Sequence, residues 1–188
     1  MMTGTSFKLE KKLFDVEAYY KMLKAGILTP ADRVELIHGE IIEMTPIGSR
    51  QASYVKKLNK LLNQLLEDEL VIGIQDPIRL TPYSEPEPDL AILKARADFY
   101  AERHPTPEDI LFLIEVADTL VGYDYDIKLP LYVAANIQEV WVLNINEEQI
   151  TQHTQPDDNQ YLKEAVFRKK EVIRCKSVLL ELAMDKIF

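Results

Sequence analysis

The sequence predicts an α/β fold, on three observations. Residues 110–117 and 90–93 form apolar runs that are typical of buried strands. Residues 49–70 carry apolar side chains at helical spacing. The C-terminal part of the chain alternates short strand patterns with polar turns near residues 146–147 and 157–159. We therefore expect strands and helices to share one hydrophobic core.

Composition limits the class of protein. The chain has 188 residues, of which 47% are hydrophobic and 28% charged, the size and balance of one globular domain spanning residues 1–188. Aliphatic runs reach only about five residues, and residues 1–14 lack the apolar segment of a secretory signal. We therefore expect a soluble, cytoplasmic protein with no membrane partner. One cysteine, Cys175, and three histidines argue against a disulfide or a zinc site.

The net charge of −9 opposes non-specific binding to nucleic acids, so a nucleic-acid function requires local positive charge. Basic residues gather on the expected helix at Arg50 and residues 56–60, at Lys94 and Arg96, and at residues 168–170. Each group could also be an ordinary solvated surface.

Two helices and a hairpin are expected before the central strands. Residues 15–25 have helical periodicity with Asp15 as N-cap, and Ser49 is the expected N-cap of the helix over 49–70. Residues 33–44 read as a hairpin that turns at His38-Gly39, which makes His38 a turn residue rather than a catalyst.

The central feature of the sequence is Glu115, a carboxylate inside the apolar run 110–117. Burying an ionised carboxylate costs many kcal/mol unless it is paired, protonated or bound to a metal. Asp89 stands at the head of the other buried strand, directly after Pro88, which can begin a strand but not continue one. These two acids are therefore candidates for one site.

An antiparallel pairing with Asp89 opposite Glu115 sets Ala91 opposite Leu113 and Leu93 opposite Leu111, all on one face. The two acids then have Cβ atoms about 5 Å apart, too close for both to stay ionised without a cation. Oxygen ligands favour Mg²⁺ or Mn²⁺, and the Val116 carbonyl could add another. Glu40, which begins the second strand of the hairpin, is either a solvated residue or a third acid reaching toward this metal.

Lys128 is the basic residue expected at this site. Because Pro130 is tolerated only in the first turn of a helix, we expect a helix over residues 126–136 with Lys128 in its first turn. A cation is unfavourable there, since the helix dipole prefers anions. An Asp, a buried Glu and a nearby Lys are what metal-assisted phosphodiester hydrolysis requires.

The segments ELIHGEIIEM, IQDPIRL, EPEPDLAIL, LIEVADT and YDYDIKLPLYVAANIQEVWVLN occur in this order. Together they resemble the Uma-type putative restriction endonucleases of the PD-(D/E)XK nuclease superfamily. The resemblance implies a restriction-endonuclease-like mixed central sheet flanked by helices, with an N-terminal hairpin and C-terminal strands. It also implies Asp89 as the motif Asp, Glu115 as its acidic partner, Lys128 as the lysine and Glu40 as the hairpin Glu.

The chain departs from the superfamily pattern at two positions. The lysine usually lies two residues after the acid, where this chain has Ala117. The Uma-type family resembles one in which the lysine has moved to the following helix, and Lys128 matches that place. Gln51 stands where the family often has His, so the role of that position stays open. Supporting roles are expected for Tyr123, Asp124 and Tyr132, although Asp124 is an equally good N-cap.

The leading hypothesis is a Mg²⁺-dependent DNA endonuclease, as a homodimer because two sites cut two strands most easily. The alternative, which the acidic balance favours, is a non-catalytic module on the nuclease scaffold that binds protein or nucleic acid. A glycosidase with paired carboxylates is a weaker possibility because it gives Lys128 no role.

Overall fold

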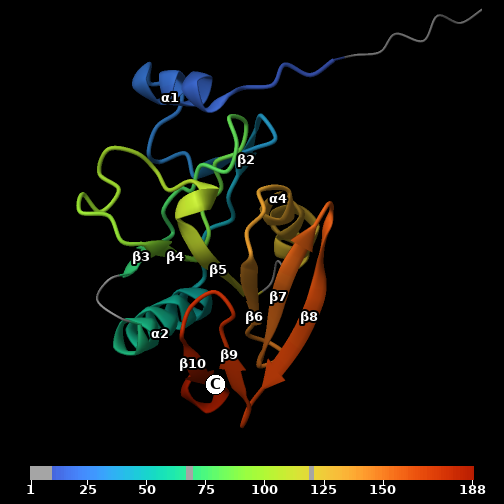
Figure 1. Cartoon of the computed structure of the whole chain (residues 1–188). Coiled ribbons are helices and arrows are strands. Elements are labelled where there is room, and N and C mark those ends of the chain that lie inside the picture. The colour runs from blue at the N-terminus through green and yellow to red at the C-terminus, as the bar shows by residue number, and fades with distance from the viewer. Residues whose placement is uncertain (1–9, 67–69, 119–120) are drawn as a thin grey trace, which may run out of the picture.

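A central six-stranded sheet organises the chain (Figure 1). The computed structural model describes residues 10–66, 70–118 and 121–188. β5 and β6 run parallel and the other neighbouring strands antiparallel, which confirms the mixed central sheet. In sheet order the strands are β3 (Leu70–Ile74), β4 (Leu90–Lys94), β5 (Ile110–Ala117), β6 (Glu139–Asn144), β7 (Gln149–Asp157) and β8 (Gln160–Arg168).

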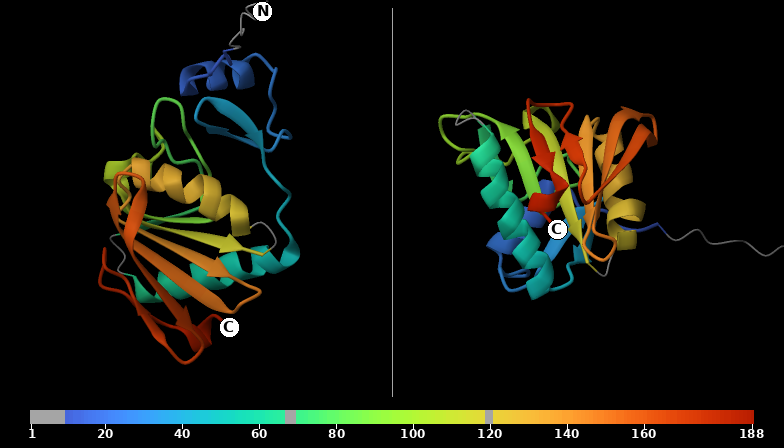
Figure 2. Two further views of the ribbon diagram at one scale, coloured as in Figure 1. Left: turned by 90° about the vertical axis from the view of Figure 1, so that its right-hand side faces the viewer. Right: turned by 90° about the horizontal axis from the view of Figure 1, so that it is seen from below.

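Helices cover both faces of this sheet, as the left view of Figure 2 shows. α2 (Ser49–Leu65) packs on one face with the C-terminal hairpin of β9 (Val172–Arg174) and β10 (Glu181–Ala183). α4 (Leu129–Ala134) packs on the other face. Alternate residues of β4 and β5 enter the two cores, since Ile92 and Phe112 face α2 whereas Ala91 and Leu113 face α4.

The N-terminal elements form a third, smaller cluster at one end of the molecule (Figure 2). α1 (Val16–Lys24) packs on the hairpin of β1 (Val34–Ile37) and β2 (Glu40–Glu43). His38 and Gly39 have φ of 50° and 78°, which confirms the predicted turn. A short 3₁₀ turn, Met184–Lys186, follows β10. No helix in the described ranges has the length and apolar character that a membrane span requires.

The predicted register of the β4–β5 pair holds at Ala91 and fails at Leu93. Ala91 pairs with Leu113 as expected, but Leu93 pairs with Ile110 instead of Leu111. A β-bulge between Ile92 and Leu93 causes the shift, because one residue of β5 has no opposite number. Leu111 therefore packs against the core on the α2 side.

The helix caps agree in part with the prediction. Asp15 caps α1, accepting a hydrogen bond from the Ala18 amide at 2.7 Å. Gly48, rather than Ser49, is the N-cap residue of α2, and Ser49 is the first helical residue. α2 ends at Leu65; of the predicted extension, residues 67–69 lie outside the described ranges, and Leu70 already belongs to β3.

The helix that carries Lys128 begins earlier than predicted. Helical structure starts with α3 (Val121–Tyr123), continues through a π-helical turn over Asp124–Lys128 and leads into α4. In the wide π turn the Leu129 amide donates to the Asp124 carbonyl, five residues back. This turn accommodates Pro130 without a new helix start, so Lys128 does not lie in a first turn and the predicted conflict with the helix dipole does not arise.

Candidate active site

Acidic side chains from several elements converge on a cavity of about 290 Å³ beside the ends of β4 and β5. The cavity is lined by only two basic side chains, Arg33 and Lys128, among the residues that the structure describes. Seven described residues contribute carboxylates to the lining: Glu35, Glu43, Glu87, Asp89, Glu115, Asp118 and Asp124. The cavity is therefore strongly negative and suited to a cation.

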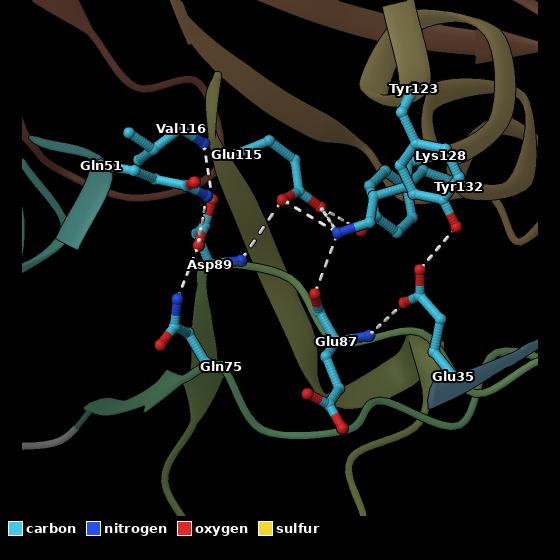
Figure 3. Close-up of polar contacts among 10 residues, drawn as sticks. All are labelled: Glu35, Gln51, Gln75, Glu87, Asp89, Glu115, Val116, Tyr123, Lys128 and Tyr132. Atoms are coloured by element: carbon cyan, nitrogen blue, oxygen red, sulfur yellow. Dashed lines mark hydrogen bonds and ion pairs between the residues drawn. The ribbon is translucent and has the colours of Figure 1, made fainter. Parts of the chain in front are cut away.

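Asp89 lies just before β4, is 7% exposed, and is held by three neutral N–H donors (Figure 3). The Val116 amide donates to Oδ2 at 2.9 Å, and the side-chain amide of Gln75 donates to Oδ1 at 2.9 Å. The Gln51 side-chain amide donates to Oδ2 at 3.2 Å. Gln75 adopts φ of 55°, in the left-handed region, and such strain is concentrated at functional sites. The carboxylate is thus fixed in direction by its neighbours.

Glu115 lies near the end of β5, is 1% exposed, and forms a buried ion pair with Lys128. The Lys128 ammonium is 3.2 Å from each carboxylate oxygen and also donates to the Glu87 carbonyl at 2.9 Å. The Tyr132 hydroxyl donates to Oε1, and the Asp89 amide donates to Oε2 at 3.3 Å. The structure thus places Asp89, Glu115 and Lys128 together, as the sequence analysis expected.

The electrostatics show an excess of negative charge. Burial raises the pKa of Glu115, which Lys128 opposes and the carboxylates of Asp124 and Asp89 reinforce. Burial acts to lower the pKa of Lys128, but Glu115 and the other nearby carboxylates outweigh it and raise that pKa. Burial also raises the pKa of Asp124 to about 6. Lys128 therefore keeps its proton. The carboxylates around it outnumber the basic groups, and a bound cation would neutralise part of this excess negative charge.

Glu35, not Glu40, is the hairpin acid at this cavity. Glu35 is 2% exposed and accepts hydrogen bonds from the Tyr123 hydroxyl at 2.6 Å and the Glu87 amide at 3.0 Å. Glu40 lies opposite Ile37 at the turn end of the hairpin, outside the described lining, and pairs with Lys11 at 2.9 Å. The expectation of a third acid at Glu40 is therefore corrected to Glu35.

The sequence contained a signal for Glu35 that was missed. Glu35 stands between Val34 and Leu36 in an apolar run, the pattern that marked Glu115. Gln75 had no comparable signal, because a glutamine after a strand is common and its contact with Asp89 exists only in the folded chain. Of the expected supporting residues, Tyr132 contacts Glu115, while Tyr123 and Asp124 line the cavity.

Comparison with known proteins gives the family. Residues 16–185 match the Uma2 family, described as putative restriction endonuclease. The chain belongs to this family. The crystal structure of a putative nuclease of the DUF820 group from Anabaena variabilis has the same fold, with a TM-score of 0.68 and 11% identity over 93% of this chain and 97% of that one. No curated protein matches the sequence.

The donors of this Uma2 family member fit a hard divalent cation. In the described ranges, no group of three or more His, Cys, Asp or Glu side chains is arranged around one metal position. Mg²⁺ often uses only one or two carboxylates and keeps several waters, so Asp89 and Glu115 suffice as protein carboxylates. The Val116 amide points to Asp89, and the carbonyl of a strand residue points to the same side as its amide. The Val116 carbonyl is therefore available as a third oxygen donor.

Proposed function

We propose that this chain is a Mg²⁺-dependent endonuclease that hydrolyses phosphodiester bonds in DNA, with Mn²⁺ as a possible substitute. The observation that carries the proposal is the convergence of buried Asp89, Glu115 and Lys128 on one acidic cavity. Membership of the Uma2 family supports the same chemistry. We also propose that the protein is a homodimer, which sedimentation analysis tests.

The side chains divide the work of hydrolysis between them. A bound divalent ion polarises the phosphate and lowers the pKa of water. Asp89, Glu115 and the Val116 carbonyl would hold that ion. Gln75 and Gln51 fix the direction of the Asp89 carboxylate, and Tyr132 fixes that of Glu115.

Lys128 retains its proton and stabilises the negative charge that grows on the phosphate oxygens. In the reaction, the water oxygen forms a bond to phosphorus while the bond from phosphorus to the leaving ester oxygen breaks. The water loses one proton and the leaving oxygen gains one.

Nicking of supercoiled plasmid tests the proposal. Wild-type protein with Mg²⁺ is expected to nick, whereas Asp89→Asn, Glu115→Gln and Lys128→Ala are expected not to. Glu40→Gln is the matched control, since it makes the same change at an acid outside the described lining of the cavity. Circular dichroism of each variant separates loss of chemistry from loss of fold. Nicking that persists in all three site variants would disprove the assignment.

One observation favours the alternative, a non-catalytic binding module. Lys128 already pairs with Glu115, and neutral amides already donate hydrogen bonds to Asp89, so both carboxylates have partners within the protein. Calorimetry with Mn²⁺ distinguishes the two functions. The nuclease proposal expects binding that Asp89→Asn weakens, and the alternative expects none in wild type.

A further inference from the structure

The reactive groups lie at the bottom of a small cavity rather than on an open surface. Glu115 is 1% exposed and Asp89 and Lys128 are 7% exposed. The cavity volume of about 290 Å³ is at the lower limit of pockets that hold one small molecule, about 300 Å³. The scissile phosphate must therefore enter the cavity, which has room for about one nucleotide.

One wall of the cavity is apolar. It is formed by Met44, Pro46 and Ile47, from the segment between β2 and α2, and by Ala117 at the end of β5. Met44 and Ile47 are only half-buried, so their side chains have surface left to contact a ligand. An apolar wall next to an acidic floor is complementary to a nucleotide, whose base is flat and apolar on its faces and whose phosphate binds a cation.

The charge of the cavity argues against close approach of a duplex. Duplex DNA carries one negative charge per about 1.7 Å of helix axis, against about 3.4 Å for each strand alone. Exposed Glu43 and half-buried Glu87 line the cavity in addition to the buried acids, so a duplex would set several phosphates against carboxylates. A single strand is flexible enough to bring one phosphate in, and an unpaired base need not be extracted from a stack.

We propose that the substrate is single-stranded DNA, or the unpaired part of a duplex, with the base of one nucleotide packed against Met44, Pro46 and Ile47. This specificity rests on the proposed nuclease function. It assigns the segment between β2 and α2 as the base-contacting wall.

The test uses one labelled oligonucleotide in three forms: single-stranded, fully annealed, and annealed around a central unpaired bubble. With Mg²⁺, cleavage of the single strand and of the bubble is expected to exceed cleavage of the duplex by about tenfold or more, with cuts confined to unpaired nucleotides. Equal or faster cutting of the duplex would overturn the substrate inference and leave the nuclease proposal intact.

Binding is measured separately by fluorescence anisotropy in Ca²⁺, with the same three oligonucleotides. If no form is cut, the nuclease proposal fails, and preference for the single strand in binding still decides the inference. Ile47→Ser is expected to weaken single-strand binding about fivefold. Ile27→Ser is the matched control, because Ile27 is 71% exposed and outside the described lining of the cavity. Equal weakening by both variants, or none by Ile47→Ser, would refute the base-contacting wall.

Discussion

Two glutamates, Glu115 and Glu139, are buried in the neighbouring parallel strands β5 and β6, with exposures of 1% and 0%. Their surroundings differ completely. Glu139 begins β6, so it lies at the opposite end of the sheet from the cavity. It accepts hydrogen bonds from the Trp141 ring at 2.7 Å, the Gln152 amide at 2.6 Å, and the Cys175–Ser177 segment that joins β9 to β10.

The comparison shows that burial alone does not identify a functional carboxylate. Fixed, neutral donors surround Glu139 and attach the C-terminal hairpin to the sheet, which is a structural role. Glu115 is paired with a lysine, has other acids nearby and faces a cavity. The kind of partner, and access to a ligand, separate the two roles.

The largest expected effect is on activity at Glu115. Glu115→Gln should lower the nicking rate by roughly a hundred- to a thousandfold, because it removes a proposed cation ligand and the partner of Lys128. Glu139→Gln should leave the rate of folded protein unchanged. Loss of activity in folded Glu139→Gln would show that the role of Glu139 is not only structural.

The next effect is on stability at Glu139. Glu139→Ala should lower the free energy of unfolding by about 3 kcal/mol, because the buried donors of Trp141, Gln152 and residues 175–177 lose their acceptor. Urea unfolding measures this loss. Glu139→Gln retains one carbonyl acceptor and should lose less, and an equal loss would argue against hydrogen bonding as the cause.

A pH effect is expected from Asp124. Its folded pKa is raised to about 6 from an ordinary value of 3.8, so its favourable contribution is complete below the unfolded pKa and is lost as pH rises through about 6. The free energy of unfolding should fall across this window by about 1 to 2 kcal/mol more in wild type than in Asp124→Asn. Identical pH profiles would show that burial does not raise the pKa of Asp124.

A smaller effect is expected from a change at Gln75. This change tests whether Asp89 needs a fixed direction as well as burial. Gln75→Asn tolerates the left-handed backbone, but its shorter amide cannot reach Asp89 in the same way. Activity should fall about tenfold with unfolding unchanged, and Mn²⁺ affinity by calorimetry should fall in parallel. Full activity would mean that Asp89 is held sufficiently by Val116 and Gln51.

The smallest effect is expected at Glu40, a half-buried residue that serves as the control for both buried glutamates. Glu40→Gln removes a surface ion pair with Lys11 and should change the free energy of unfolding by no more than about 0.5 kcal/mol. A large loss of activity in this variant would return Glu40 to the site.

Local sequence patterns predicted β4, β5, the C-terminal strands, the turn at His38-Gly39 and the pairing of Ala91 with Leu113. They also brought Asp89, Glu115 and Lys128 to one site. Two of the errors occurred where one extra residue enters a regular element, at Leu111 in β5 and in the π turn before Pro130. The regular periods of a strand and an α-helix do not show such an insertion.

The third acid was misplaced for a related reason. Glu35 and Glu40 lie on the same face of the hairpin, because Glu35 pairs with Ile42 and Glu40 pairs with Ile37. The alternation of side chains alone therefore could not show which of the two acids reaches the cavity. The loop that carries Glu87 decides this, by donating its amide to Glu35.

The π turn over Asp124–Lys128 sets the directions in which the side chains before and after it point. Each residue advances an α-helix by about 100°, so deleting one residue here would rotate Tyr123 relative to Tyr132 by about that angle. Tyr123 could then not reach Glu35 while Tyr132 still reached Glu115. Because of the extra residue, tyrosines of one helical segment donate hydrogen bonds to acids from two separate parts of the chain, Glu35 and Glu115.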